Sequence, residues 1–352
     1  MRQSHRSSFS SATAGALCLA LVGGVTAVAV ADEPEPAPLV SAYSDEAADL
    51  LAVLASASTP DRDVLADVAT QPSQGHGDLA LDVSTEVADV TVPVDPEGAV
   101  DLTSQSGESL SLELPHAAGA QSAQPIADGI VAYQNDNETL TVPVVKNDGS
   151  VQVTTIIESA QSPERYPYEV SLPDGAQAEI VEGGGVQFTS SAGEFLGGFT
   201  PPWATDADGA SLPTWYEIDG STITQVVDHQ DSGAAYPIVA DPWLGADLFG
   251  YTGYNRKGTW GGQVVISAKL SGWGWYWYTT GSGQAILHSA GWSELLKKRP
   301  QADDKATLKQ QYQCHVVFGY AVWLAGLHWD LEKARANKSN WLASAASHKC
   351  NW

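Results

Sequence analysis

Residues 139–157 read TLTVPVVKNDGSVQVTTII, and this stretch decides the fold class. Two runs of alternating, largely β-branched residues flank the turn sequence KNDGS at 146–150. Alternation with a period of two predicts β-strands, and Asn-Asp-Gly between two such runs predicts a hairpin. The centre of the chain is therefore expected to be antiparallel β-structure.

The same pattern extends from residue 78 to residue 240. Turn sequences such as PDG and IDG separate further short runs, among them LALDV, VADVTVPV, SLSLEL, YEVSL, AEIV, TWYEI and TITQVV. So many short strands predict an antiparallel sandwich or barrel. Ahead of them, Ser44–Ser56 predicts a short helix with an apolar stripe at Leu50, Leu51 and Leu54.

Charge divides the chain into two parts. Residues 32–240 hold 35 acidic and three basic residues, whereas residues 241–352 hold seven acidic and twelve basic ones. Ten of the twelve tryptophans also lie in the second part. This contrast predicts an acidic linker with a short helix at 32–75, an acidic β-rich leader or pro-like domain at 76–240, and an aromatic-rich α+β domain at 241–352.

The N-terminus predicts export. Arg2 and Arg6 precede an uncharged apolar stretch, and Ala29 and Ala31 form a cleavage pattern. Residues 1–31 are therefore expected to be a signal peptide, and the protein to be secreted or extracellular. A transmembrane anchor is the less favoured alternative.

Two cysteines remain after the signal peptide, Cys314 and Cys350. In an oxidising compartment these two are expected to form a disulfide. Two free thiols are one alternative. A metal site with His315 and the histidines at 328 and 348 is another, but its spacing matches no standard zinc arrangement. No metal or cofactor is therefore expected.

Aromatic residues dominate the C-terminal part. QVVISAKL and WGWYWYTTG are expected to form strands, which would put Trp273, Trp275 and Trp277 on one face and Tyr276 and Tyr278 on the other. A strand that is aromatic on both faces exposes one of them unless something covers it. These five residues are therefore candidates for a ligand-binding surface, with a purely structural role as the alternative. Further on, a helix capped by Ser289 is expected to end at Lys298. A second helix is expected to contain Cys314 and to end at Gly326. Shorter helical pieces are expected over 329–337 and 340–347.

Catalytic candidates are weak. There is no G-x-S-x-G motif for a serine nucleophile. Glu294, Asp330 and His315 are the candidates for acid–base chemistry in a hydrolase. Glu294 and Asp330 also suit ordinary positions near helix starts, so a non-enzymatic protein is favoured.

Two family resemblances follow from particular motifs. The segment from FTPPW at 199–203 to YPIVADPW at 236–243 is similar to a leader module of secreted actinobacterial proteins. The later motifs resemble a domain-of-unknown-function family from the same bacteria, and they are WSEL at 292–295, QYQCH at 311–315, WDLE at 329–332, Arg335, and CN at 350–351. The resemblance implies a secreted protein with a disulfide-bonded C-terminal domain, and it implies no particular activity.

Taken together, these patterns predict a secreted two-domain α+β protein whose C-terminal domain binds a cell-envelope component, such as a wall polymer, or another partner. A nucleic-acid partner is not expected. An antibacterial effector masked by the acidic domain, which would dock on the basic one, is an alternative. A wall-polymer hydrolase is another.

Overall fold

The computed structural model describes residues 40–352 apart from 60–62, 71–75, 106, 108, 280–282, 321–326, 349 and 351. The predicted signal peptide, the acidic stretch before residue 40 and the predicted helix end at Gly326 lie outside the described residues. The chain is β-rich up to Gly245 and mixes a small sheet with helices after it.

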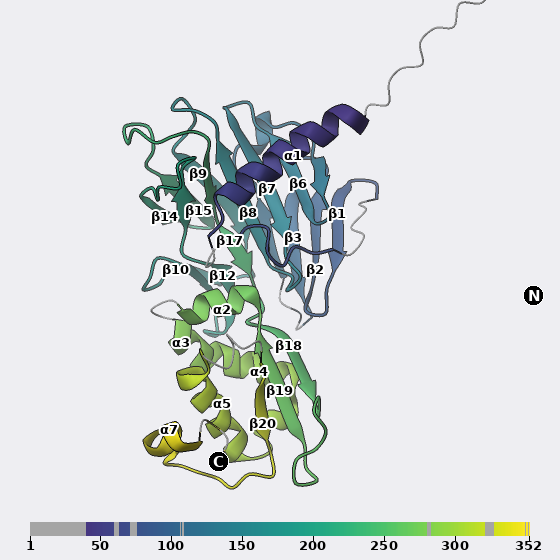
Figure 1. Ribbon diagram of the computed structural model, residues 1–352, viewed down its shortest axis with the longest axis vertical. Coiled ribbons are helices and arrows are strands. Elements are labelled where there is room, and N and C mark those ends of the chain that lie inside the picture. Colours follow the sequence, from purple (N-terminus) through teal and green to yellow (C-terminus); the bar gives the residue numbers. More distant parts are fainter. Residues whose placement is uncertain are drawn as a thin grey trace, which may run out of the picture. The chain divides into compact units, whose positions relative to one another are not determined.

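Two antiparallel sheets form a sandwich (Figure 1). The seven-stranded sheet has the order β1-β2-β3-β4-β9-β15-β14, with β1 Leu79–Ser84, β2 Ala88–Pro93, β3 Ala99–Ser104, β4 Ser109–Glu113, β9 Arg165–Ser171, β14 Thr214–Asp219 and β15 Thr222–Val227. The ten-stranded sheet contains β5 Gln124–Ala127, β6 Ile130–Gln134, β7 Thr139–Val145, β8 Val151–Ile157, β10 Gln177–Ile180, β11 Val186–Thr189, β12 Phe195–Phe199, β13 Trp203–Thr205, β16 Ile238–Asp241 and β17 Trp243–Gly245. The predicted antiparallel β-rich region is therefore confirmed, as a sandwich.

The predicted central hairpin is confirmed in register. Strands β7 and β8 pair antiparallel with Val145 opposite Val151, so that the KNDGS turn joins them directly. Gly149 has a φ of 75°, a left-handed conformation that glycine adopts without steric cost. The turn sequence therefore sets the register of the strands that follow it.

Helix α1, Val40–Ser56, lies over the outer face of the ten-stranded sheet (Figure 1). Leu50 and Leu54 pack there against Ile130 and Val142. The opposite face of the same sheet packs in the sandwich core, for example through Val131. Both faces of β6 to β8 are therefore buried. The helix begins four residues earlier than predicted, at Val40 instead of Ser44.

The C-terminal part has its own core of buried aromatic and aliphatic residues. Its small antiparallel sheet consists of β18 Phe249–Tyr254, β19 Val265–Leu270 and β20 Trp329–Glu332. Its helices are α2 Gly272–Thr279, α3 Gly283–Ile286, the π-helical turn η2 Leu287–Gly291, α4 Trp292–Lys298, the 3-10 turn η3 Pro300–Asp303, α5 Ala306–Phe318, the 3-10 turn η4 Trp341–Ser344 and α7 Ala345–His348. The predicted α+β character of this part is confirmed.

Two predicted elements were assigned to the wrong class. The sequence from Trp273 to Thr279 belongs to the helix α2, not to a strand. WDLE at 329–332 is the strand β20, not a helix, because it pairs with β19 and buries Trp329 and Leu331 on one face. Asp330 is therefore not a helix cap.

The predicted helix start at Ser289 is also wrong. Ser289 lies within the π-helical turn, and its hydroxyl donates to the carbonyl of Ala285 one turn earlier. α4 follows directly, and its polarity matches the prediction, since Glu294 lies in the first turn and Lys298 in the last.

Hydrogen bonds connect the sandwich to α2. Asp148, in the central hairpin turn, accepts a 3.0 Å hydrogen bond from the backbone N–H of Trp273. The indole of Trp273 donates to the carbonyl of Trp243 in β17, and the indole of Trp243 donates to Ser150. The KNDGS turn between β7 and β8 therefore holds the start of α2.

Candidate functional site

The five aromatic candidates occupy different environments because they lie on a helix. Trp273 and Trp277 are four residues apart, so both point into the C-terminal core and are fully buried. Tyr278 is also buried, whereas Trp275 and Tyr276 are half-buried. The predicted division into a tryptophan face and a tyrosine face is therefore wrong. The three buried rings have a packing role.

A group of three rings extends from the core to the surface, and we call Tyr278, Trp275 and Tyr320 the aromatic stack. Tyr278 is its buried base, Trp275 is half-buried and Tyr320 is exposed. Trp275 lies on Tyr278 with ring centroids 5.1 Å apart and planes within 20°. Trp275 also contacts Tyr320, with ring centroids 5.1 Å apart and the planes tilted by 37°. The side chain of Tyr320 is 52% exposed, and Phe318 at the end of α5 is 48% exposed. The sequence did not single out Tyr320 or Phe318, because the helix containing them was read as an ordinary amphipathic one.

Glu294 lies in a buried ion cluster. One carboxylate oxygen accepts from the backbone N–H of Leu248 at 2.8 Å. The other accepts from the N–H of Phe249 at 3.1 Å and from Lys298 at 2.8 Å. Lys298 also donates to Asp247 at 2.5 Å. Both oxygens of Glu294 thus hold the start of β18 against α4, which is a structural role.

Burial sets the protonation of this cluster. Loss of solvent raises the pKa of Glu294 to about 7, against the attraction of Lys298. Burial by itself would lower the pKa of Lys298, but Glu294 and Asp247 outweigh it and raise that pKa. Lys298 therefore remains charged between the two acids, and it compensates the negative charge they carry.

A pocket of about 160 Å³ opens beside this cluster. Its walls come from the β11–β12 hairpin of the sandwich and from α3, η2 and α4 of the C-terminal part, and they include Gln187, Phe195, Asp247, Ser289, Ser293 and Glu294. Asp247 was not a candidate from the sequence, since a single acidic residue in a loop carries no signal of its own.

Asp330 and His315 lie elsewhere on the small sheet and α5. Asp330 accepts a 2.5 Å hydrogen bond from Ser267 and lies 3.9 Å from Arg256 and 3.8 Å from Lys257. His315 is buried and stacked on Trp329, with centroids 5.7 Å apart. Among the described contacts, no residue joins Asp330 to Glu294.

His315 is held in its neutral form. Burial lowers its pKa to about 4, and neither ring nitrogen has a hydrogen-bond partner in the described structure. A neutral imidazole stacked on an indole behaves as an aromatic core residue. Asp330 lies close enough to His315 to oppose part of this lowering of its pKa, whereas Glu294 belongs to the separate ion cluster with Asp247 and Lys298.

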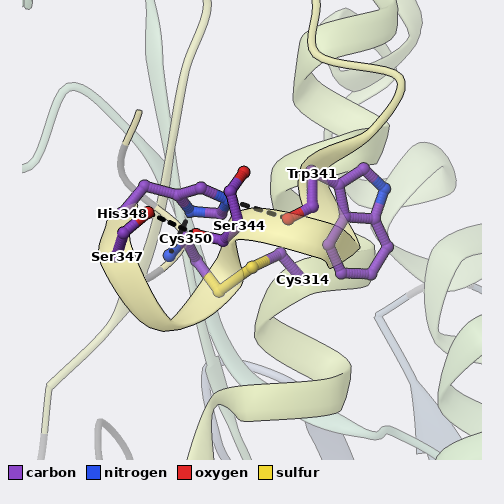
Figure 2. The surroundings of a disulfide bond; sticks show 6 residues. All are labelled: Cys314, Trp341, Ser344, Ser347, His348 and Cys350. Carbon is purple, nitrogen blue, oxygen red and sulfur yellow. Dashed lines mark hydrogen bonds between the residues drawn. A yellow bond between two sulfur atoms is a disulfide. The ribbon is translucent and has the colours of Figure 1, made fainter.

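The cysteines form the expected disulfide, which Figure 2 shows between α5 and the C-terminal tail. Cys314 and Cys350 are both buried. Beside them, the ring of His348 bonds to the carbonyl of Trp341 at 2.9 Å. Arg335 donates to the backbone carbonyl of Trp352, so the tail is held both covalently and by hydrogen bonds.

Two further properties concern the described part of the chain. Its histidine, cysteine and acidic side chains include no group of three or more arranged to hold a metal ion. Each helix in it is too short or too polar to cross a bilayer.

Comparison with known proteins identifies one relationship. Residues 277–352 match a family described as "Protein of unknown function (DUF2599)". This range holds the WSEL, QYQCH and WDLE motifs and both cysteines. No curated protein matches the chain. The expected similarity to a domain-of-unknown-function family is therefore confirmed for the C-terminal part, and the family description assigns no activity to it.

Proposed function

We propose that this is a secreted protein whose C-terminal part binds a component of the bacterial cell envelope through the aromatic stack. The observation that carries the proposal is the pair of ring contacts on Trp275, which fix three aromatic rings side by side at a surface where Tyr320 is half exposed. Ordered rings lose little conformational entropy on binding, and their faces suit sugar rings and other ligands with apolar faces.

Two lines of support favour export. The first 31 residues have the composition of a signal peptide. A disulfide between two buried cysteines is typical of proteins outside the reducing cytosol. Secretion predicts that the protein recovered from the medium of a secreting host begins near Asp32. Mass spectrometry of that protein tests the cleavage site, and an uncleaved N-terminus on cell-bound protein would contradict it.

Charge supports an anionic envelope polymer as the ligand. Arg256, Lys257 and Lys269 lie close enough to His328 to contribute, after burial, to lowering its pKa. Asp330 offsets part of this positive charge, because it lies 3.9 Å from Arg256 and 3.8 Å from Lys257. A cationic area of this kind attracts phosphate- or carboxylate-bearing polymers, and salt screens that attraction.

A pull-down of the oxidised full-length chain with purified bacterial walls and with membranes, at low and high salt, tests the proposal. Tyr320→Ala removes an outer ring of the aromatic stack, and Trp275→Ala removes the ring on which the stack is built. Trp215→Ala is the matched control, because Trp215 is 43% exposed but lies on β14 of the sandwich.

We expect binding that weakens at high salt, because salt screens the cationic area, but that persists there through the aromatic stack. Binding should fall at least tenfold in Tyr320→Ala and Trp275→Ala and be unchanged in Trp215→Ala. Equal binding by all four proteins would place the contact elsewhere. No binding to either preparation would remove the envelope as the partner, and the effector and hydrolase hypotheses would then be tested on living cells and on wall polymers.

A further inference from the structure

Three large side chains are exposed close together in the C-terminal part. Phe318, the last residue of α5, is 48% exposed, Tyr320 is 52% exposed, and Leu327, two residues before β20, is 49% exposed. Gly319 packs against β20, since a Cβ on it would lie 2.7 Å from the indole nitrogen of Trp329. This contact brings the end of α5 beside the start of β20, and we call Phe318, Tyr320 and Leu327 the apolar patch.

A cationic face of the small sheet adjoins the apolar patch. His328 follows Leu327 directly, and its ring meets that of Tyr251 on β18 with centroids 4.9 Å apart. Tyr251 in turn pairs with Lys269 on β19. Burial lowers the pKa of His328 most, and three nearby cations lower it further, namely Arg256, Lys269 and Lys257. The apolar patch therefore continues into a positively charged surface.

The cationic face keeps a net positive charge. Asp330 lies 3.9 Å from Arg256 and 3.8 Å from Lys257, so it offsets one of the three cations. Glu332 also lies on β20, but it forms an ion pair with Arg335. Three cations and one carboxylate leave two positive charges. A ligand can reach this charge at Lys257, since the side chain of Lys257 is 60% exposed.

An anionic lipid bilayer complements this surface better than a wall polymer does. Leu327 has no ring face for a sugar, and neither Leu327 nor Phe318 has a polar group to bond to sugar hydroxyls. At a bilayer, apolar side chains enter the boundary between headgroups and acyl chains, and adjacent cations bind lipid phosphates. The whole chain carries a net charge of −25, so it is repelled from anionic surfaces in general and needs a local cationic area to approach one.

We propose that the C-terminal part adsorbs to the surface of a bilayer that contains anionic lipids, with Phe318 and Leu327 entering the headgroup boundary and Lys257 contacting lipid phosphates. This contact goes beyond the one proposed for the aromatic stack. Tyr320 belongs to both surfaces, so the test uses Phe318 and Leu327, which lie outside the stack. Vesicles contain no wall polymer, so vesicle binding and wall binding can fail separately.

Sedimentation of sucrose-loaded vesicles with the oxidised chain from Asp32 onward tests the proposal. This chain keeps every described element and lacks the apolar N-terminal stretch, whose own insertion into lipid would obscure the result. Vesicles of phosphatidylcholine alone are compared with vesicles of equal parts phosphatidylcholine and phosphatidylglycerol. The double variant Phe318→Ser/Leu327→Ser removes the apolar groups, and Lys257→Gln removes an exposed charge.

Two variants serve as matched controls. Trp215→Ser removes an apolar side chain of similar exposure, 43%, from β14 of the sandwich. Lys309→Gln removes an exposed cation from α5. Lys309 lies nine residues before Phe318, which at about 3.6 residues per turn is the opposite side of the helix. Far-ultraviolet circular dichroism should match the wild type in all four variants, which checks that they are folded.

We expect the wild type to sediment with the anionic vesicles and only weakly with phosphatidylcholine alone. The double variant should bind at least tenfold more weakly, and Lys257→Gln about fivefold more weakly, an effect typical of one cation at an anionic membrane. Both controls should bind as the wild type does.

Three results would overturn the proposal: no binding to the anionic vesicles, unchanged binding by the double variant, or equal binding to both kinds of vesicle. Full competition by glycerophosphate at the same phosphate concentration would also overturn it. Glycerophosphate carries the phosphate without acyl chains, so the cationic face would then recognise a free phosphate compound and not a bilayer.

Discussion

Removal of the Cys314–Cys350 disulfide should destabilise the C-terminal part by a calculable amount. The two cysteines are 36 residues apart in the sequence. In the loop-entropy description, a cross-link over this length restricts the unfolded chain enough to stabilise the folded state by about 4 kcal/mol at room temperature. That is a large share of the roughly 5–15 kcal/mol typical of folded domains. The double variant Cys314→Ala/Cys350→Ala should lose most of this stabilisation.

Guanidinium unfolding followed by tryptophan fluorescence measures the loss, because ten of the twelve tryptophans lie in residues 241–352. The oxidised wild type, the reduced wild type and the double variant are compared at one pH. Reduced wild type and double variant should unfold at nearly the same denaturant concentration, well below that of the oxidised protein. This comparison separates the cross-link from the packing of the two sulfur atoms.

The reasoning is refuted if the double variant loses less than about 1 kcal/mol. The tail would then be held mainly by its other contacts, such as the bond from Arg335 to the carbonyl of Trp352 and the bond from the indole of Trp352 to Ala336. A reduced wild type much more stable than the double variant would instead show that alanine disturbs the buried cluster around Cys314.

Three further predictions concern the buried groups of the C-terminal part. Gly274→Ala should destabilise the protein by about 1–3 kcal/mol in urea unfolding, because a Cβ at this position would lie 2.1 Å from the carbonyl oxygen of Leu248. Gly272→Ala, whose Cβ meets nothing closer than 3.4 Å, should be near neutral, and equal effects of the two would contradict this account. The pKa of Glu294, about 7, lies above its unfolded value of 4.5, so the stabilisation from this group is present at low pH and is lost as pH rises through 7. The urea midpoint of the wild type should therefore fall over this pH range, and Glu294→Gln should remove that fall. The pKa of His315, about 4, lies below its unfolded value of 6.5, so the stabilisation from this group is present above pH 6.5 and is lost as pH falls through 4. His315→Phe should therefore reduce the fall of the urea midpoint at acidic pH. An unchanged dependence of the midpoint on pH would show that the imidazole is not held neutral.

Local sequence patterns were sufficient for the antiparallel strands, but they did not choose between a sandwich and a barrel. These strands alternate with a period of two, and the KNDGS turn joins β7 to β8 in the register that the two runs suggest. Such signals are local, because side-chain alternation and turn chemistry depend on neighbouring residues only. The predicted runs left out β3, β5, β6, β12, β13 and β17. Of these, β5, β12 and β13 are short or glycine-containing, so they lack this alternation.

The helix α2 shows where local reasoning failed. Alternating aromatic residues predict a strand, but Trp273 and Trp277 are also spaced for one face of a helix. One local signal did favour the helix: the hydroxyl of Ser271 accepts the N–H of Gly274 at 2.7 Å, as a helix cap does. The strand β20 carried a similar signal, since WDLE alternates between buried and half-buried residues.

The candidate site depended more on tertiary contacts than the fold did. Glu294 and the aromatic residues were visible as candidates, but the sequence could not say which rings would be buried. Tyr320 joins the aromatic stack from just beyond the end of α5, more than forty residues after Trp275. Asp247 becomes notable only because Lys298 and the pocket lie beside it.

Periodicity, composition and cysteine count are properties of the chain alone, and they predicted the β-rich and α+β parts, export and the pairing of the two cysteines. Only the tertiary structure decided the class of α2. Asp148 in the hairpin turn bonds to the N–H of Trp273, which lies 125 residues later. It also decided which carboxylates are buried together, since burial and ion pairing depend on what distant segments place around a side chain. The surface proposed for binding is therefore formed by segments far apart in the sequence, and local patterns do not predict which of them pack together.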